Sequence, residues 1–566
     1  MKILLIQPPI QDFYQTSIRT QPIGLAYLAA SLKTDGHEVD ILDCQTEKKR
    51  SIPIPSELSY LKDFYPFNDR SPFKLYTGYY HFGMDWEEIG QKIKDSNADV
   101  FGISSSFTPY HGESLTIARI IKKWDGKKIV IMGGAHVSCD PEGVLQTSLV
   151  DYAVLGEGEV RLPRLIEEIE KKDFKEITEM DGIGYRKDGE IRINPLQNFI
   201  QDLDSLPHPA RELLDLDRHR IREKHSTMII TSRGCPHGCA YCSTHLVMGT
   251  SFRTRTPEAI LREMVECKEQ FGILAFDIED DNFTFDQERS KRLMDLIIKN
   301  FGEDRLELSA MNGVSFASLD EELLRLMKKA GFHTINLSFV SANPLTREEM
   351  RRPKPTTEFD KILEKAEQVG LNVIAYAILG MPGQTIEEMV DTLIYLMGKR
   401  LLIGPSIYYP TPGTPLFERC KKEGILPSHF SQWRSSALPI ETKEFSRLDL
   451  LTLFRLARVI NFVKAKMDEE ELDEGITWKE LLRDLKDKVE VELKDDQLAW
   501  VNLILNLFRE KAFSSLRKDS GGRVSALKGK SSRKVVDYFF DKALENPILK
   551  SRAISNKEEC NYLLGR

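Results

Sequence analysis

Residues 228–242 read MIITSRGCPHGCAYC, and this stretch decides how the rest of the chain is interpreted. It begins with an apolar run that predicts a buried strand. Three cysteines follow, Cys235, Cys239 and Cys242, in a C-x3-C-x2-C spacing. Glycine and proline between them allow the backbone to turn tightly. A strand that ends in a compact, cysteine-rich loop predicts a metal site at the end of that strand.

The chemistry of the three thiols narrows the kind of metal site. Thiolates are soft ligands that favour iron–sulfur clusters or zinc. A structural zinc ion takes four ligands, usually from two paired elements, and only one such element is present, which His237 or His245 would have to complete. Three thiolates suit a [4Fe–4S] cluster, because they hold three irons and leave the fourth open. We therefore expect a cluster on Cys235, Cys239 and Cys242, with zinc as the alternative.

Composition excludes several classes of protein. The chain has 566 residues and only eight cysteines, too few for a disulfide scaffold. Lys and Arg number 79 against 87 Asp and Glu, a net charge of −8, which argues against a dedicated nucleic-acid binder. No apolar run reaches the length of a membrane span, and the first residues do not read as a signal peptide. We therefore expect a cytoplasmic protein without a membrane span.

Downstream of the cysteines, strand and helix patterns alternate. The expected strands are 228–231, 274–278, 306–310, 334–339, 373–378 and 405–408, and the expected helices are 257–270, 286–299, 320–330, 358–370 and 386–397. Six strand–helix units in a row predict a partial (β/α)6 barrel of the TIM type, over residues 226–440. Its active site is expected at the carboxyl ends of the strands.

Upstream, residues 1–180 show a second alternating series. The expected strands are 2–7, 39–42, 100–104, 129–132 and 152–155, with helical patterns between most of them. The pattern predicts a doubly wound, Rossmann-like or flavodoxin-like parallel sheet. Such sheets bind ligands beyond the carboxyl ends of their strands, so the loops at 7–9, 104–108, 133–137 and 156–159 are candidates.

Three further segments complete the expected organisation. Residues 45–80 are rich in Pro, Tyr and charge and read as an insertion or long loop. Residues 181–225 read as a connector with a hairpin around Asp188-Gly189. Residues 441–566 read as a mainly helical region, with packing helices at 450–463 and 498–508 and a basic, solvated loop at 517–534.

The cysteine stretch resembles a known signature. A C-x3-C-x2-C motif with an aromatic residue, here Tyr241, before the third cysteine and after the first barrel strand resembles that of radical S-adenosylmethionine enzymes. The resemblance implies that the open iron binds the amino and carboxylate groups of S-adenosylmethionine. One electron then cleaves the cofactor to a 5′-deoxyadenosyl radical, which abstracts hydrogen from a substrate.

The resemblance also implies where S-adenosylmethionine is bound. Acidic residues at the end of the second barrel strand would receive its ammonium group. Residues at the end of the fourth strand would contact its ribose and carboxylate, and Arg351 or Arg352 could pair with the carboxylate. A glycine turn after the fifth strand would contact its adenine. The candidates are Glu279, Asp280, Asp281, Ser338, Ser341, Gly380, Pro382 and Gly383.

Residues 1–180 resemble the cobalamin-binding domain of the B12-dependent group of radical S-adenosylmethionine enzymes. The segments that carry the resemblance are QPP (7–9), PIGLAYLA (22–29), GGAH (133–136) and GEGE (156–159). The candidate cobalamin contacts are Pro8, Ser104, Ser105, Thr108, Gly133, Gly134, His136, Gly156 and Gly158. The chain lacks the Asp-x-His-x-x-Gly motif of proteins that ligate cobalt through histidine, so we expect His136 to be structural or a contact to the corrin edge.

This resemblance implies three cofactors: a [4Fe–4S] cluster, S-adenosylmethionine and cobalamin as methylcobalamin. The leading expectation is methylation of an unactivated carbon of a small-molecule or lipid substrate, with electrons from a ferredoxin or flavodoxin. A second expectation keeps both cofactors without methyl transfer, for ring closure or rearrangement of a tetrapyrrole or natural product. A third, of another class, is a cobalamin-binding regulatory module, although such a module has no need of the three cysteines.

Overall fold

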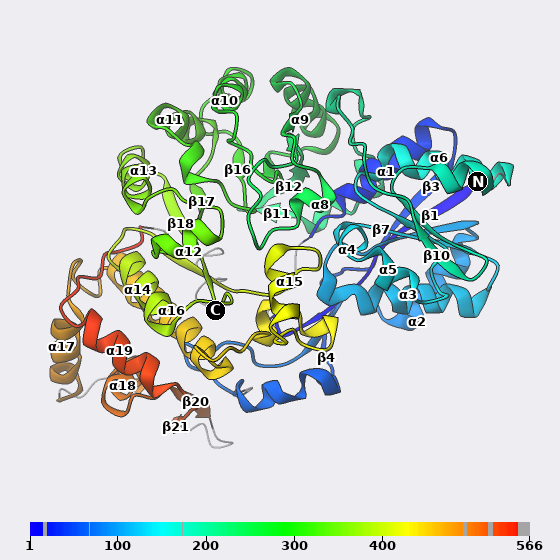
Figure 1. The fold of residues 1–566 in the computed structure, drawn as a ribbon. Coiled ribbons are helices and arrows are strands. Elements are labelled where there is room, and N and C mark those ends of the chain that lie inside the picture. Colours follow the sequence, from blue (N-terminus) through cyan, green and yellow to red (C-terminus); the bar gives the residue numbers. More distant parts are fainter. Residues whose placement is uncertain (15–19, 67, 173, 491–494, 519–523, 553–566) are drawn as a thin grey trace.

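The computed structural model describes residues 1–14, 20–66, 68–172, 174–490, 495–518 and 524–552. Three regions follow one another along the chain, and Figure 1 shows them side by side. The first sheet lies at one end, the barrel helices arch over the middle, and the last helices lie at the other end. The predicted order of an α/β domain, a partial barrel and a mainly helical region is confirmed.

The first domain is a doubly wound parallel sheet. Its parallel strands lie in the order β3 (Glu38–Asp43), β1 (Lys2–Gln7), β6 (Val100–Ser104), β7 (Ile129–Gly133) and β8 (Tyr152–Val154). Helices α1 (Ile23–Thr34) and α6 (Gly158–Lys171) share the core on one face, and α2 (Trp86–Ser96) and α3 (His111–Trp124) share the core on the other. The strand order reverses between β1 and β6, so the topological switch point lies there.

The connector contributes to this sheet. The expected hairpin forms as β9 (Ile183–Lys187) and β10 (Glu190–Ile193), and β9 pairs antiparallel with β8. The sheet therefore continues past residue 180. The physical reason is that β8 would otherwise present an unpaired edge, which the hairpin covers.

The barrel has the six expected parallel strands. They are β12 (Lys224–Ile229), β15 (Ala275–Ile278), β16 (Glu307–Ser309), β17 (Thr334–Val340), β18 (Asn372–Leu379) and β19 (Leu402–Ile407). The covering helices are α9 (Pro257–Phe271), α10 (Gln287–Phe301), α11 (Glu321–Ala330), α13 (Thr356–Gln368) and α14 (Ile386–Met397). Strand β12 begins four residues before the expected 228, and it ends at Ile229, so the turn into the cysteine loop starts earlier than the apolar run suggests.

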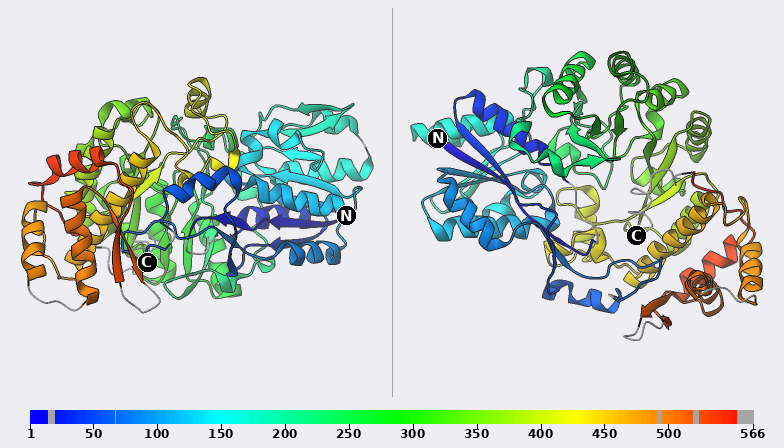
Figure 2. Two further views of the ribbon diagram at one scale, coloured as in Figure 1. Left: turned by 90° about the horizontal axis from the view of Figure 1, so that it is seen from below. Right: turned by 180° about the vertical axis from the view of Figure 1, so that it is seen from behind.

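The insertion at residues 45–80 packs against the barrel and the carboxyl-terminal region. Strands β2 (Ile10–Asp12), β4 (Lys49–Ser51) and β5 (Tyr80–Phe82) form a small antiparallel sheet, and η1 (Ser56–Asp63) follows β4. Its large side chains, among them Leu58, Tyr65, Phe73 and Tyr79, join the core of the barrel and the carboxyl-terminal region. Figure 2 shows this blue segment beside the yellow and orange ones in both views.

The carboxyl-terminal region closes the barrel beyond its sixth strand. It contains α16 (Arg447–Asp468), α17 (Trp478–Glu490), α18 (Asp495–Glu510), β20 (Ser514–Lys518), β21 (Val524–Lys528) and α19 (Arg533–Ala543). The helices expected at 450–463 and 498–508 lie within α16 and α18. The expected loop at 517–534 is instead largely the hairpin β20–β21, except for 519–523, which lie outside the described residues. Among the described residues, no helix is long and apolar enough to cross a membrane.

Candidate functional site

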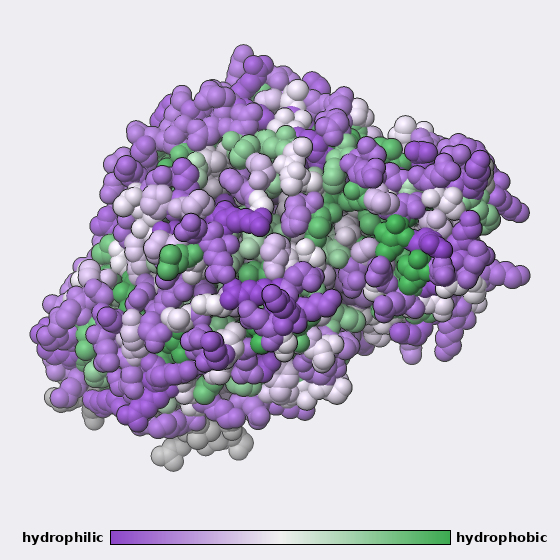
Figure 3. Space-filling view, viewed as in Figure 1, coloured by the Kyte–Doolittle hydropathy of each residue, from purple (hydrophilic) through white to green (hydrophobic). Residues whose placement is uncertain are grey.

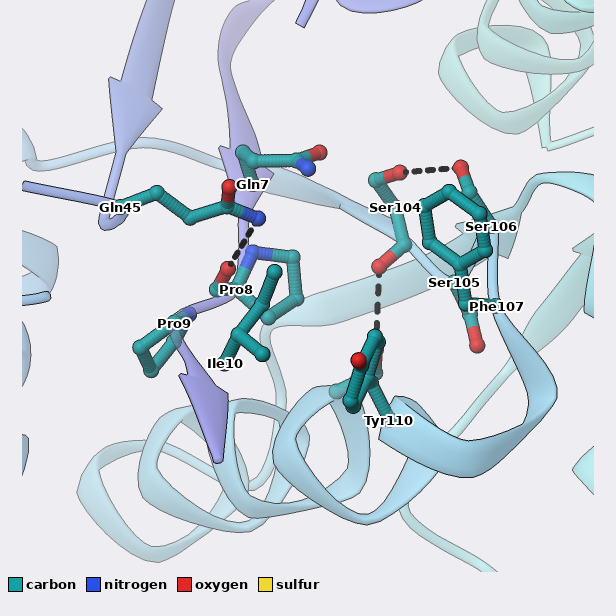
Figure 4. A pocket seen from close by; sticks show the side chains of 11 residues that line it. Gln7, Pro8, Pro9, Ile10, Gln45, Ser104, Ser105, Ser106, Phe107 and Tyr110 are labelled. Atoms are coloured by element: carbon teal, nitrogen blue, oxygen red, sulfur yellow. Dashed lines mark hydrogen bonds between the residues drawn. The ribbon is translucent and has the colours of Figure 1, made fainter. Parts of the chain in front are cut away.

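A pocket lies at the switch point of the first sheet, between the ends of β1 and β6. Figure 4 shows its lining, which comprises Gln7, Pro8, Pro9, Ile10, Gln45, Ser104, Ser105, Ser106, Phe107, Tyr110 and Ser114. Its empty volume is about 270 Å³, partly open to solvent. Because this volume includes open solvent, the enclosed part of the hollow is far smaller than a small-molecule cavity and can take only an edge of a ligand as large as a corrin. The structure thus brings together three of the expected contacts, Pro8, Ser104 and Ser105.

Behind this pocket, two histidines contact the loop at residues 104–108 that follows β6. Ser105 Oγ lies 3.0 Å from His111 Nδ1, and His136 Nδ1 lies 3.1 Å from Thr108 Oγ1. Both rings are buried, with centroids 4.4 Å apart. Burial lowers the pKa of His136 to about 4 and that of His111 to about 3, so both rings are neutral at neutral pH. His136 packs behind the loop, as a structural residue would.

The glycines of the 133–134 segment allow a close approach to the same loop. Gly134 has a φ of +114°, and a Cβ there would lie 2.8 Å from the Ser105 carbonyl. The Ser105 amide donates to the Gly133 carbonyl oxygen at 2.7 Å. The expected contacts Gly133, Gly134, Thr108 and His136 therefore form one unit with the pocket wall.

The GEGE loop, in contrast, faces the barrel. A Cβ at Gly156 would lie 2.9 Å from Leu196, and one at Gly158 would lie 2.8 Å from Leu28. Protein side chains thus already fill the space beside both glycines. The intervening Glu157 is buried in ion pairs with arginines of the barrel domain.

The three cysteines lie in one closed loop at the carboxyl end of β12. Strands β13 (Ser232–Arg233) and β14 (Arg253–Thr254) pair antiparallel and close it, so residues 234–252 form the cluster loop. Cys239 is buried, and Cys235 and Cys242 are half-buried. The Cys242 amide donates to the Cys239 carbonyl oxygen at 3.1 Å.

The donor set of this loop fits an iron–sulfur cluster. All cysteines among the described residues are free, and Cys560 lies outside them. Within the described chain no three His, Cys, Asp or Glu side chains, the three cysteines included, converge on the position of a single ion. Next to Cys235, the Asn282 amide nitrogen lies 3.9 Å from its sulfur, while the buried Asn282 Oδ1 has no hydrogen-bond partner. Three thiols with an unsatisfied polar atom beside them suit a larger polar group.

Three consecutive carboxylates at the end of β15 have three different environments. Asp280 is buried and accepts hydrogen bonds from the Thr231 amide, the Thr231 hydroxyl and the Ser232 hydroxyl at 2.5–2.6 Å. Asp281 accepts from the Gly234 amide at 3.2 Å and from Thr244 Oγ1 at 3.0 Å. Asp280 therefore holds the chain before the cysteines, and Asp281 holds it on both sides of them.

Glu279 instead lies on the face of β15 that it shares with Asp277. Side chains alternate along a strand, and Phe276 and Ile278 occupy the opposite face. Asn312 donates to Glu279 Oε2 at 2.7 Å, and Ser309 donates to Asp277 Oδ1 at 2.7 Å. Burial raises the pKa of Glu279 to about 8, and the neighbouring Asp277 charge adds to the effect. This pair forms the acidic part of the barrel lumen.

A β-bulge separates the two serines at the end of β17. The register shifts between Ser338 and Val340, and Val340 has a φ of +72°. Ser338 Oγ lies close to Gly313, where a Cβ would be 3.1 Å away, so it faces the lumen. Ser341 is buried and its hydroxyl donates to Glu388 of α14 at 3.2 Å. Ser338 thus lies beside Gly313, which follows Asn312, the hydrogen-bond donor to Glu279.

The remaining expected contacts surround the cluster loop and the fifth strand. Arg351 Nη1 donates to the Gly238 carbonyl oxygen at 3.0 Å, and Arg352 bonds to the Tyr241 hydroxyl. In the turn after β18, a Cβ at Gly380 would lie 2.7 Å from Leu450, and Pro382 is buried. Gly383 has a φ of +94°. Packing against α16 thus accounts for Gly380.

A buried junction that no sequence pattern predicts lies beneath the pocket. Asp12 accepts from the Tyr110 hydroxyl at 2.6 Å and from Ser436 Oγ at 2.8 Å, and Arg434 lies 3.2 Å from its carboxylate. Tyr110 lines the pocket, whereas Arg434 and Ser436 follow the barrel. Asp12 and Arg434 are more than 400 residues apart in sequence, and no local motif marks either.

Comparison with known proteins agrees with this geometry. The sequence profile of the B12 binding domain matches residues 77–166, and that of the radical SAM superfamily matches residues 229–396. The first covers β6, β7 and β8 of the pocket sheet, and the second covers the cluster loop. The chain therefore carries a B12 binding domain followed by a radical SAM domain, the pair of domains that the sequence resemblance implies. Its cofactors are a [4Fe–4S] cluster, S-adenosylmethionine and cobalamin, as expected.

Relatives of this chain include two proteins named as methyltransferases. One, from Pyrococcus horikoshii, is named an uncharacterized methyltransferase and is 26% identical over 496 residues, covering 86% of this chain and 98% of its own. The other is the cytidylyl-2-hydroxyethylphosphonate methyltransferase of Streptomyces wedmorensis, 25% identical over 474 residues, covering 76% and 84%.

Solved structures share the fold. The radical S-adenosylmethionine methyltransferase TsrM from Kitasatospora setae superposes with a TM-score of 0.58 at 18% identity, covering 75% of this chain and 76% of that one. The cobalamin-dependent enzyme OxsB, with aqua-cobalamin bound, has a TM-score of 0.58 at 14% identity, covering 90% and 71%.

Proposed function

We propose that the protein transfers a methyl group from cobalamin to an unactivated carbon of a small-molecule or lipid substrate. The observation that supports this proposal is that two candidate cofactor sites lie on adjoining domains. One is the pocket at the β1–β6 switch point and the other is the cluster loop at the end of β12. The curated relatives named as methyltransferases support it.

The chain's own residues have separable tasks in this reaction. When bound, the cluster supplies the electron that cleaves S-adenosylmethionine, and cobalamin carries the methyl group. Glu279 is the residue best placed to receive the ammonium of S-adenosylmethionine, because its neighbour Asp280 already accepts three hydrogen bonds from the protein. The pocket wall at Ser104 and Ser105 offers hydroxyls and backbone groups to an edge of the corrin.

The space between the sites is suited to an apolar part of a substrate. Several large apolar side chains at strand ends are exposed, among them Phe107 at 50%, Met311 at 49% and Tyr409 at 42%. Figure 3 shows apolar residues gathered where the first domain meets the barrel. Electrons would come from a ferredoxin- or flavodoxin-type donor.

Anaerobic reconstitution with iron, sulfide and cobalamin, followed by absorption and electron paramagnetic resonance spectroscopy, tests the two-cofactor site. We expect one cluster and one corrin per chain, and a Cys239→Ala variant that keeps the corrin and loses the cluster. A wild-type protein without bound corrin would overturn the proposal.

The reaction itself is tested with S-adenosylmethionine that carries a deuterated methyl group, incubated with a metabolite extract and a reductant. We expect a product that gains one deuterated methyl. Some relatives are named anaerobic magnesium-protoporphyrin IX monomethyl ester cyclases. A consumed substrate whose product gains no methyl would therefore favour ring closure or rearrangement.

A further inference from the structure

The GEGE loop after β8 connects the first domain to the barrel through buried charges. Glu157 lies 2.9 Å from Arg233 and 2.8 Å from Arg253, and Glu159 lies 2.6 Å from Arg233. The exposed fractions of the side chains are 0% for Glu157, 4% for Arg253 and 5% for Arg233. The contact is therefore fully enclosed by protein and not a surface ion pair.

The two arginines occupy a special place in the barrel domain. Arg233 and Arg253 lie directly opposite one another in the β13–β14 ladder. We call this ladder, residues 232–233 and 253–254, the neck of the cluster loop. Because Cys235 follows Arg233 by two positions, any separation of the neck strands displaces the first cluster thiol.

The neck is tightly packed, and Glu157 is bonded into it from several sides. Gly234 has a φ of +81°, and a Cβ there would lie 2.3 Å from the Ser251 carbonyl oxygen. Arg253 also donates to the carbonyl oxygens of Met248 and Ile200 at 2.6 Å. The Ile200 amide in turn donates to Glu157 Oε2 at 2.8 Å. Glu157 thus bridges both neck strands and the incoming connector.

A buried network of this kind is a costly way to gain stability. Taking charges out of water offsets much of their attraction, whereas removal of one partner leaves a buried charge that is strongly unfavourable. The best-attested use of such groups is to fix one geometry. Here the geometry that they fix is the position of the cluster loop on the cobalamin-binding domain.

We propose that Glu157 is a positioning residue for the iron–sulfur cluster. Its carboxylate reaches from the cobalamin-binding domain to both strands of the neck, so the cluster loop keeps its three thiolates in place only while the two domains are docked. This inference goes beyond the proposed methyl transfer and holds whichever reaction the enzyme performs.

The test uses the full-length chain carrying Glu157→Gln, reconstituted anaerobically with cluster and cobalamin. The readouts are the rate of iron release to a chelator and the hydrogen exchange of residues 234–252. We expect iron release at least tenfold faster than in the wild type and faster exchange in the cluster loop. Bound cobalamin should be retained, because the β1–β6 pocket does not include Glu157.

A matched control is Asp151→Asn at the other end of β8. It removes the same charge in the same domain, from an ion pair with Lys122 at the start of the three-residue strand β8. Its iron release should equal that of the wild type. A folded Glu157→Gln protein with wild-type iron release and exchange would overturn the proposal.

A second variant covers the case in which Glu157→Gln does not fold. Arg253→Lys keeps the positive charge but loses the planar fork that reaches Glu157, Ile200 and Met248 together. Faster iron release from this variant supports the bridge, and an unchanged rate contradicts it.

Discussion

Buried carboxylates lie beside the neck of the cluster loop and in the lumen of the barrel, and the two groups differ in what satisfies them. Beside the neck, Asp280 accepts three hydrogen bonds from the protein, and Glu157 forms ion pairs with two arginines. In the lumen, Asp277 and Glu279 lie beside each other and have only neutral donors among the described contacts.

This difference distinguishes carboxylates that stabilise the fold from carboxylates that are available to a ligand. A carboxylate whose hydrogen bonds and charge are matched by the protein stabilises one geometry, whereas one that is buried against a like charge is poised for a cation that the protein lacks. Glu279 and Asp280 are neighbours in sequence, yet they fall on opposite sides of this division.

The largest expected effect is that of Asp280→Ala, which tests the neck. Its removal leaves the Thr231 amide and two hydroxyls without an acceptor, and we expect the barrel to lose roughly 3–5 kcal/mol of unfolding free energy. Thermal unfolding of the iron-free protein measures the loss. Glu288→Ala on the exposed face of α10 is the control. An unchanged melting temperature in Asp280→Ala would show that Asp280 does not stabilise the neck.

The next effect is that of Glu279→Gln, which tests the lumen. We expect the affinity for S-adenosylmethionine to fall roughly tenfold to hundredfold, because a hydrogen bond between charged groups contributes about 1.5–3 kcal/mol. Equilibrium dialysis on the reconstituted protein measures it, with Glu288→Gln as the charge-matched control. Equal affinities of the wild type and Glu279→Gln for S-adenosylmethionine would show that Glu279 does not bind its ammonium group.

A smaller effect is the pH dependence of stability from the same pair. The pKa of Glu279 is raised from 4.5 to about 8, so the folded chain holds a proton that the unfolded chain releases. Stability is therefore lost as the pH rises from about 4.5 through about 8. The pKa of Glu113 is raised to about 8 and the pKa of Lys464 is lowered to about 7, so these groups titrate in the same range with opposite effects. The contribution of Glu279 is therefore read from two proteins: from pH 6 to pH 8 the urea midpoint of the iron-free wild type should fall further, or rise less, than that of Glu279→Gln. An equal change in both proteins would show that only other groups titrate.

The smallest effects come from the two serines around the bulge of β17. Ser341→Ala removes a hydroxyl that donates to Glu388 and should cost about 1 kcal/mol without changing S-adenosylmethionine binding. Ser338→Ala should weaken S-adenosylmethionine binding and leave the unfolding free energy unchanged. If both variants change only stability, the lumen does not include Ser338.

Most elements of the fold could be predicted because their signals are local. The six barrel strands and the five parallel strands of the first sheet are short apolar runs between glycine-, proline- or charge-rich turns, and the structure has each of them. The errors lie where tertiary packing overrides the local pattern. The hairpin at 183–193 joins a sheet because β8 has an open edge, and the bulge at Val340 turns Ser341 away from the lumen.

The sequence by itself indicated where cofactors are expected, because three thiols within one tight turn predict a metal cluster and the loops of a parallel sheet predict a ligand-binding edge. Only the tertiary structure decided which carboxylates are available to a ligand. Glu157 and Arg253 are 96 residues apart, and Glu279 differs from Asp280 only in the face of the strand on which it lies. Burial and partners, which set the cost of a charge, arise from packing between distant segments, and no spacing of residues along the chain encodes them locally.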